Sequence, residues 1–222
     1  MADTTLYFFP LSCARVAMTA LEQVGIDYDV SVINLMAHGQ KAPEYLAINP
    51  VGKVPALKVG DEVLTENVAI ILYLDELYPE AKLLPPATGP IDRARARADL
   101  MWVATVLHPL VRQLRAPKHY TTGDTAPVSD NALEEFGHHF AELDAKFATR
   151  DWWYGAQWAA IDGYLAWILS GFTSVGNKLD AFPALAGYVQ RLHAHPAYAR
   201  MFAKEGELME QQGLTLPPHV VR

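Results

Sequence analysis

The sequence predicts two domains, an N-terminal α/β domain followed by a C-terminal domain made only of helices. Three observations predict this arrangement. Residues 1–82 alternate β-branched and aromatic runs with runs of helical periodicity, residues 83–90 are rich in proline and glycine, and residues 91–222 show helical patterns without a convincing strand. A chain of 222 residues has room for two domains, because domains cluster at roughly 100–150 residues.

The first half of the N-terminal domain is a strand, a helix and a second strand. Residues 5–9 are β-branched and aromatic, which favours a strand. Apolar residues then recur at helical spacing over 16–24, and Gly25 ends the predicted helix. Residues 28–35 are the second strand candidate, so a compact βαβ unit is expected.

The second half of this domain is a hairpin and a helix. Residues 54–65 form two short strand patterns around Gly60-Asp61, a strong turn signal. Residues 66–79 are apolar with helical periodicity, and Pro79 stops the helix. The order βαβ followed by ββα predicts a thioredoxin-like domain.

The C-terminal domain is expected to contain several helices joined by polar loops. An exposed loop is predicted at 119–131, and the charged run RARAR (93–97) is most simply a solvated helix face, with ion pairs across a dimer axis as the alternative. The predicted helices span 91–116, 130–148, 160–172, 182–194 and 197–212.

Composition and charge exclude several classes of protein. With 51% hydrophobic residues, 19% charged residues and a net charge of -7, the chain is predicted to be globular and not to bind nucleic acid, which requires a basic face. A single cysteine cannot close an intramolecular disulfide, so a cytoplasmic location is expected. The longest apolar run, 68–74, is far shorter than the ~18 residues of a membrane span, and no cysteine and histidine cluster suggests a metal.

Cys13, the only cysteine, is the first candidate for chemistry. Packing is the commoner role for an unbridged cysteine. The predicted elements, however, place Cys13 in the first turn of a helix, where unpaired N–H groups and the helix dipole favour a thiolate. Cys13 is therefore a candidate nucleophile, and Ser12 either caps the helix or hydrogen-bonds a substrate sulfur.

Two further stretches carry candidate binding groups. Pro55 opens a predicted strand, and a cis Val54–Pro55 bond would leave the N–H and C=O of Val54 on an open edge for a peptide-like ligand, although the sequence leaves the isomer open. Glu66 and Asn67 open the next helix. The amides there would hold a carboxylate and Glu66 an ammonium, with an ordinary acidic first turn as the alternative.

Three stretches together resemble the cytosolic glutathione transferases: PLSCARVAMTALEQVG (10–25), NPVGKVPAL (49–57) and TENVAIILYLDELYP (65–79). Cys13 falls where the bacterial beta class carries its cysteine. The resemblance covers nearly the whole chain and implies the glutathione transferase fold and a homodimer with no permanently bound cofactor. It also implies an enzyme that activates glutathione, its co-substrate, for conjugation to small hydrophobic electrophiles or for exchange with disulfides, as in detoxification. The implied glutathione site comprises Cys13, Lys53, Val54, Pro55, Glu66 and Asn67.

The stretch WVATVLHPL (102–110) resembles the beta-class helix whose histidine faces the thiol of bound glutathione. The resemblance therefore implies that His108 is catalytic together with Cys13 and Ser12, although a partly buried histidine beside Pro109 is the simpler interpretation of the residues alone. Apolar pockets commonly form where domains meet. The hydrophobic substrate pocket is accordingly predicted to be lined by Leu11, Trp102, Leu107, Leu114 and Trp167.

The sequence departs from the family pattern at three places. Asn67 stands where many relatives have serine, and Phe8 takes the place of the tyrosine used by the mammalian alpha, mu and pi classes, so activation by tyrosine is not expected. Ala159 replaces the hydroxyl residue that caps a helix of the C-terminal domain. That helix start must then depend on Asp162 or on contacts of Trp158.

Two other functions compete with this hypothesis. The first is a glutathione-dependent isomerase of the zeta type, because both motifs open with Ser-Cys, although Arg15 lies two places after Cys13 and the zeta pattern has its basic residue three places after. The second is a non-catalytic module that binds glutathione and has a regulatory role. The joint presence of Cys13, Glu66 and His108 favours an enzyme.

Overall fold

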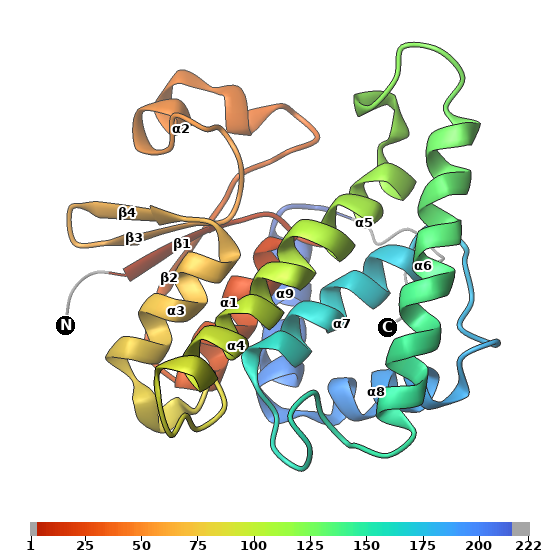
Figure 1. Cartoon of the computed structure of the whole chain (residues 1–222). Helices are drawn as coiled ribbons and strands as arrows, with labels where there is room; N and C mark the ends of the chain where they lie inside the picture. The colour runs from red at the N-terminus through yellow and green to blue at the C-terminus, as the bar shows by residue number, and fades with distance from the viewer. Residues whose placement is uncertain (1–3, 215–222) are drawn as a thin grey trace. The chain divides into compact units, whose positions relative to one another are not determined.

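The computed structural model describes residues 4–214, and these residues form two compact units (Figure 1). The first unit comprises residues 4–83 and 196–214, and the second comprises residues 84–195. The boundary at 83/84 falls at the start of the predicted linker, 83–90. The last helix of the chain, which the sequence analysis assigned to the helical domain, groups with the first unit because its contacts are made there.

A four-stranded sheet forms the centre of the first unit. Its strands are β1 (Thr4–Phe8), β2 (Asp29–Val32), β3 (Ala56–Val59) and β4 (Glu62–Thr65), in the order β2-β1-β3-β4. Strand β1 is parallel to β2 and antiparallel to β3, and β4 is antiparallel to β3. This topology confirms the predicted thioredoxin-like domain, and the hairpin turns at Gly60, whose positive φ of 58° suits glycine.

Helices cover both faces of this sheet (Figure 1). Helices α1 (Ala14–Val24) and α3 (Asn67–Leu77) lie on one face, and α1 ends at Gly25 as expected. The other face carries a segment without a sequence prediction, the 3₁₀ turn η1 (Gly39–Lys41) and α2 (Pro43–Ile48). The buried Tyr45 anchors α2, since its ring lies 5.5 Å from that of Tyr7 and its hydroxyl donates to the Lys53 carbonyl (2.6 Å). A further 3₁₀ turn, η2 (Pro79–Ala81), follows α3.

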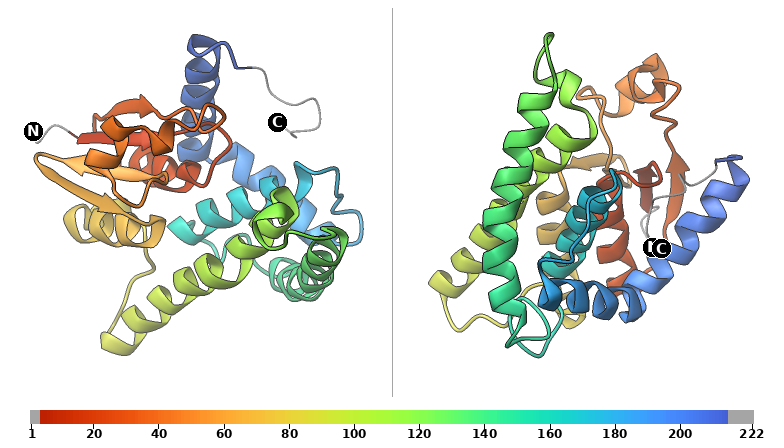
Figure 2. Two further views of the ribbon diagram at one scale, coloured as in Figure 1. Left: turned by 90° about the horizontal axis from the view of Figure 1, so that it is seen from above. Right: turned by 90° about the vertical axis from the view of Figure 1, so that its right-hand side faces the viewer.

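Helix α9 (Pro196–Gln211) completes the first unit by packing along α1, as the views in Figure 2 show. The two helices are linked at the C-terminal end of α1. There the Glu22 carboxylate accepts hydrogen bonds from Arg200 (3.3 Å) and Tyr28 (2.7 Å) and forms an ion pair with Lys204 (2.9 Å). The C-terminal helix is therefore part of the thioredoxin-like unit's packing.

The second unit is helical, as predicted. Helix α7 (Ala160–Thr173) is buried along almost its whole length and contacts both α5 and α8. Aromatic rings of α6, α7 and α8 fill the core, including Phe140, Phe172 and Tyr188. The surrounding elements are α4 (Pro90–Trp102), η3 (Val103–Leu107), α5 (His108–Arg115), η4 (Pro117–His119), α6 (Ala126–Phe147) and α8 (Pro183–Ala194).

Residues 91–116, predicted as one helix, contain a π-helical segment, η3, between α4 and α5. Pro109 explains it, because proline has no N–H to donate to the carbonyl four residues earlier and its ring crowds that carbonyl. Helix α6 also begins inside the segment predicted as a loop at 119–131, at Ala126 with a proline in its first turn. Among residues 4–214, no helix is both long and apolar enough to cross a membrane.

Candidate functional site

Cys13 lies at the N-cap position of α1, in the loop formed by residues 9–13, called here the Cys13 loop. The side chain is half-buried, and its Sγ donates a hydrogen bond to the Val54 carbonyl at 3.4 Å. Only the protonated thiol makes this bond, since a thiolate has no hydrogen to donate. The helix start favours a thiolate, so a ligand that occupied the Val54 carbonyl would free the thiol to ionise.

Ser12 serves the loop itself. Its hydroxyl donates to the Phe9 carbonyl (2.6 Å) and accepts from the Ala14 N–H (3.2 Å). This is the capping role, one of the two that the sequence allowed. The other role, a hydrogen bond to a substrate sulfur, would require the hydroxyl to leave the Phe9 carbonyl.

The structure resolves the alternative at Pro55, because the Val54–Pro55 peptide bond is cis. Both residues are buried. The preceding residue, Lys53, has an exposed side chain, and its carbonyl accepts from Tyr45 and from Asn49 Nδ2 (2.8 Å). Helix α2 therefore fixes the backbone that leads to Val54.

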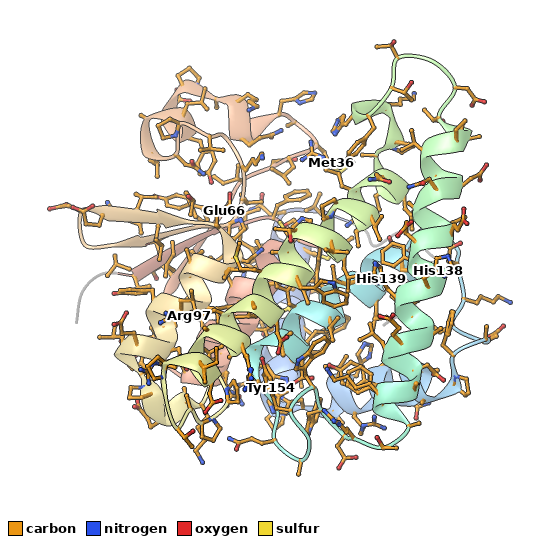
Figure 3. All side chains as sticks on the ribbon, in the orientation of Figure 1. Met36, Glu66, Arg97, His138, His139 and Tyr154 are labelled. Atoms are coloured by element: carbon orange, nitrogen blue, oxygen red, sulfur yellow. The ribbon has the colours of Figure 1, made fainter. Side chains whose placement is uncertain are left out.

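Glu66 and Asn67 stand at the start of α3, and Figure 3 marks Glu66 there. The exposed Glu66 has a φ of 71°, in the left-handed region that residues other than glycine seldom adopt. Asn67 is only 5% exposed, and its Oδ1 is buried without a hydrogen-bond partner among residues 4–214. A buried amide oxygen without a partner is costly, and a strained neighbour is typical of functional sites.

His108 belongs to the second unit and opens α5 directly after the π-helical segment. Its Nδ1 lies 2.7 Å from the hydroxyl of Tyr164, and its ring centroid lies 4.4 Å from that of Trp167. Tyr164 is buried on α7. A hydrogen-bond partner at one ring nitrogen influences which nitrogen of a histidine carries the proton.

The five residues predicted to line a hydrophobic pocket differ in environment. Leu107 is fully buried (0% exposed), so in this structure it is a core residue and offers no surface to a ligand. Leu114 and Trp167 are nearly buried, whereas Leu11 and Trp102 are partly exposed. The ring of Trp102 lies 5.8 Å from that of Trp153. Their common role in binding substrate stays a prediction.

A pocket of about 150 Å³ lies elsewhere in the first unit, lined by residues of β1, β3 and α3 that include Thr4, Leu57 and Tyr73. It contains none of the predicted site residues. Among residues 4–214, no group of three side chains from histidine, cysteine, aspartate and glutamate is placed to hold a metal ion.

Two residues that contact the candidate site were not predicted to have a role in it. Tyr164 is buried on α7, and nothing in the sequence pairs it with His108. Glu205, on α9, accepts the backbone N–H of Leu11 (2.8 Å) in the Cys13 loop. Only a signal that joined positions 194 apart in the chain could have identified it.

Comparisons with known proteins show what the chain is similar to. The family model described as glutathione S-transferase, N-terminal domain, matches residues 6–82. A maleylacetoacetate isomerase of Pseudomonas aeruginosa is 34% identical over 200 residues, covering 86% of this chain and 91% of that protein. The structure of a sphingomonad glutathione S-transferase complexed with glutathione is 33% identical, with a TM-score of 0.78, and the match covers 91% of this chain and 98% of the other. A bacterial beta class glutathione S-transferase of Sphingomonas chungbukensis is 28% identical, with a TM-score of 0.79 and coverage of 91% and 98%.

Proposed function

Because the chain belongs to the glutathione transferase family, we propose that it is an enzyme that binds glutathione as co-substrate and activates its thiol. The observation that carries the proposal is the position of Cys13 at the start of α1 with its thiol on the Val54 carbonyl. The backbone of Val54 would pair with the peptide of glutathione, beside Pro55 and Lys53. His108, as the resemblance implies, would donate to the glutathione sulfur.

The start of α3 supports the same proposal. The γ-glutamyl end of glutathione carries a carboxylate and an ammonium. The N-terminal amides of α3 and the side chain of Asn67 would hold the carboxylate, and Glu66 would receive the ammonium. Asn67 would hold the carboxylate through its amide Nδ2, and its unpartnered Oδ1 supports a ligand here because the ammonium of the ligand would donate to it.

The first reaction that fits is conjugation. The thiol of glutathione loses its proton to a base or to water, and the thiolate attacks an electrophilic carbon of a small hydrophobic substrate. A carbon–sulfur bond forms as the leaving group departs with its electron pair. With chlorodinitrobenzene the products are the thioether, chloride and a proton.

The second reaction is thiol–disulfide exchange, for which Cys13 itself is the nucleophile. Its thiolate attacks the glutathione sulfur of a mixed disulfide, forming a Cys13–glutathione disulfide and releasing the other thiolate. A second glutathione thiolate then attacks this disulfide, releasing oxidised glutathione and Cys13.

Affinity capture on immobilised glutathione, followed by assays with chlorodinitrobenzene and with a glutathione mixed disulfide, tests the proposal. We expect capture and turnover of at least one substrate, with Cys13→Ala abolishing exchange and partly sparing conjugation. Binding without turnover of any electrophile or disulfide would instead support the non-catalytic regulatory module. Absence of binding would contradict the glutathione site.

A glutathione-dependent isomerase of the zeta type is the second candidate. The similarity to the maleylacetoacetate isomerase of Pseudomonas aeruginosa favours it, and it would use the same glutathione site. The displaced Arg15 argues against it. Spectrophotometric measurement of maleylacetoacetate isomerisation with and without glutathione decides, since a transferase of the beta type would leave that substrate unchanged.

We also propose that the protein is a cytoplasmic homodimer. Exposed apolar side chains support a dimer surface, among them Leu77 on α3 and Ile91 and Met101 on α4. The exposed arginines of RARAR (93–97) would pair with Glu76 or Glu80 of a second copy. Sedimentation should give a dimer at micromolar concentration, and a stable monomer there would contradict the proposal.

A further inference from the structure

We propose that Glu205, on the C-terminal helix α9, is a positioning residue for the Cys13 loop. The inference rests on the proposed role of Cys13 as a nucleophile. All the contacts that carry it lie within the first unit, where α9 packs along α1. They connect the loop before the first helix to a residue near the end of the chain.

The Cys13 loop contains a backbone conformation that requires external support. Leu11 has a φ of 62°, in the left-handed region, which is costly for a residue with a branched side chain. Its N–H donates to Glu205 Oε1 at 2.8 Å. This hydrogen bond holds the turn two residues before the nucleophile, so Glu205 acts on Cys13 through the backbone.

A buried arginine fixes the carboxylate of Glu205 in turn. The Nε of Arg15 donates to both carboxylate oxygens (2.8 and 3.0 Å), and a terminal guanidinium nitrogen forms an ion pair with Oε2. Arg15 and Glu205 are each 2% exposed. Burial by itself lowers the pKa of Arg15, but the hydrogen bonds and the charge of Glu205 outweigh it and raise this pKa above its ordinary value.

The geometry distinguishes positioning from simple cross-linking of two helices. An ion pair whose only role was to join α1 to α9 would need no contact beyond its two charged side chains. The ion pairs of Glu22 with Arg200 and Lys204, at the other end of α1, are of this kind. Glu205 also accepts the N–H of Leu11, and the same loop then presents the Cys13 thiol to Val54. The pair with Arg15 therefore fixes an acceptor whose position determines that of the Cys13 loop.

A matched pair of double variants separates the two roles. Arg15→Met with Glu205→Gln removes both charges and keeps a carbonyl acceptor for Leu11. Arg15→Met with Glu205→Leu removes both charges and the acceptor. Neither variant leaves an unpaired buried charge, the usual reason why a change to one partner of such a pair prevents folding. Glu22→Gln serves as the control, because it weakens the contact between α1 and α9 without touching the Cys13 loop.

The readout is the alkylation of Cys13 by iodoacetamide without glutathione, followed against pH by the mass of the intact chain. The chain has one cysteine, so the added mass reports this residue alone. The limiting rate at high pH, where every thiol is ionised, measures access to the sulfur. The midpoint of the profile is the apparent pKa of the thiol, which measures how far the loop and the helix start stabilise the thiolate.

We expect the Leu double variant to raise the limiting rate by about threefold or more, the scale of losing one hydrogen bond, and to move the midpoint. The Gln double variant keeps the acceptor but lacks the arginine that fixes it, so it should change less than the Leu double variant, and Glu22→Gln should match the wild type. If the two double variants change alike, if neither changes, or if Glu22→Gln changes as much, the positioning role is wrong. Calorimetric titration of the wild type with glutathione tests the proposed function separately, because alkylation requires no glutathione.

Discussion

Glu66 has a left-handed backbone at the start of α3 although it is not a glycine, and its side chain is exposed. Strain of this kind persists where the surrounding structure fixes it, often at a ligand site. For Glu66→Ala we expect glutathione binding to weaken by on the order of 1.5–3 kcal/mol, the scale of a charge-assisted hydrogen bond. Calorimetry measures the dissociation constant, with Glu62→Ala, which removes an exposed carboxylate at the start of β4, as the control. An unchanged dissociation constant would remove Glu66 from the site.

Tyr164 is expected to control the proton on His108. With Tyr164→Phe the ring of His108 keeps its contact with Trp167 but loses the hydroxyl 2.7 Å from Nδ1. We expect kcat/KM for glutathione to fall by about threefold to tenfold, the scale of one hydrogen bond, with the fold intact. Tyr154→Phe is the control, because that hydroxyl donates to Asp99 in the same unit. Equal effects of the two variants would show that His108 does not depend on Tyr164.

At the scale of elements, the start of α7 depends on a single carboxylate. Ala159 offers no side-chain oxygen, and Asp162 Oδ2 accepts the Ala159 N–H (2.8 Å) while Oδ1 accepts the Trp153 N–H and the Tyr188 hydroxyl (2.6 Å). Of the two possibilities that the sequence left open, Asp162 or contacts of Trp158, the structure shows Asp162 bonded to this helix start. Burial nevertheless outweighs these three hydrogen bonds and raises the pKa of Asp162 to about 6.

The raised pKa of Asp162 predicts how stability changes with pH. The folded protein keeps a proton on Asp162 at pH values where the unfolded chain, with a pKa near 3.8, has lost it. Lowering the pH through about 6 therefore stabilises the fold, and the gain levels off below the unfolded value. Relative to Asp162→Asn, which cannot titrate, the wild type should gain about 1 kcal/mol between pH 7.5 and pH 5. Chemical denaturation measures this difference, and a value constant across that range would contradict the assignment.

The elements show where sequence reasoning succeeds and where it does not. Periodicity located the strands and the long helices, and the turn chemistry of Gly25 and Gly60 located their ends, because these signals are local. Helix α2 was missed because its six residues are held by one buried tyrosine and too few apolar positions to show a period. The π-helical segment was missed because Pro109 indicates that the helix is interrupted but not whether the interruption is a kink, a break or a π-helical turn.

The candidate site residues also divide into those with a local sequence signal and those without one. Cys13, Val54 and Glu66 stood out because each lies at a recognisable strand or helix start in the sequence. Tyr164 and Glu205 did not, since each acts on a residue distant in the chain, and an isolated polar residue within a helix has no signature of its partner. Prediction from sequence therefore named candidate groups at element ends and did not name the residues that contact them.

At the scale of the whole molecule, the first unit is not a contiguous stretch of sequence. Without α9, the face of α1 that carries Arg15 would be open to water, and the hydrogen bond to Leu11 would be lost. A chain ending at His195 should therefore lose cooperative unfolding of the first unit, whereas a chain ending at Leu214 should keep it. Urea unfolding followed by circular dichroism compares the two chains, and equal transitions would show that α9 is dispensable.

The bond between Leu11 and Glu205 also has a consequence for synthesis on the ribosome. The β strands and helices of residues 4–83 emerge first, yet the acceptor that sets the turn before Cys13 is encoded 194 positions later. At the ~5–20 residues per second of translation, residues 4–83 wait on the order of ten seconds or more before Glu205 is synthesised. A nascent chain thus carries the complete sheet of the first unit before it carries the carboxylate that accepts the Leu11 N–H beside Cys13.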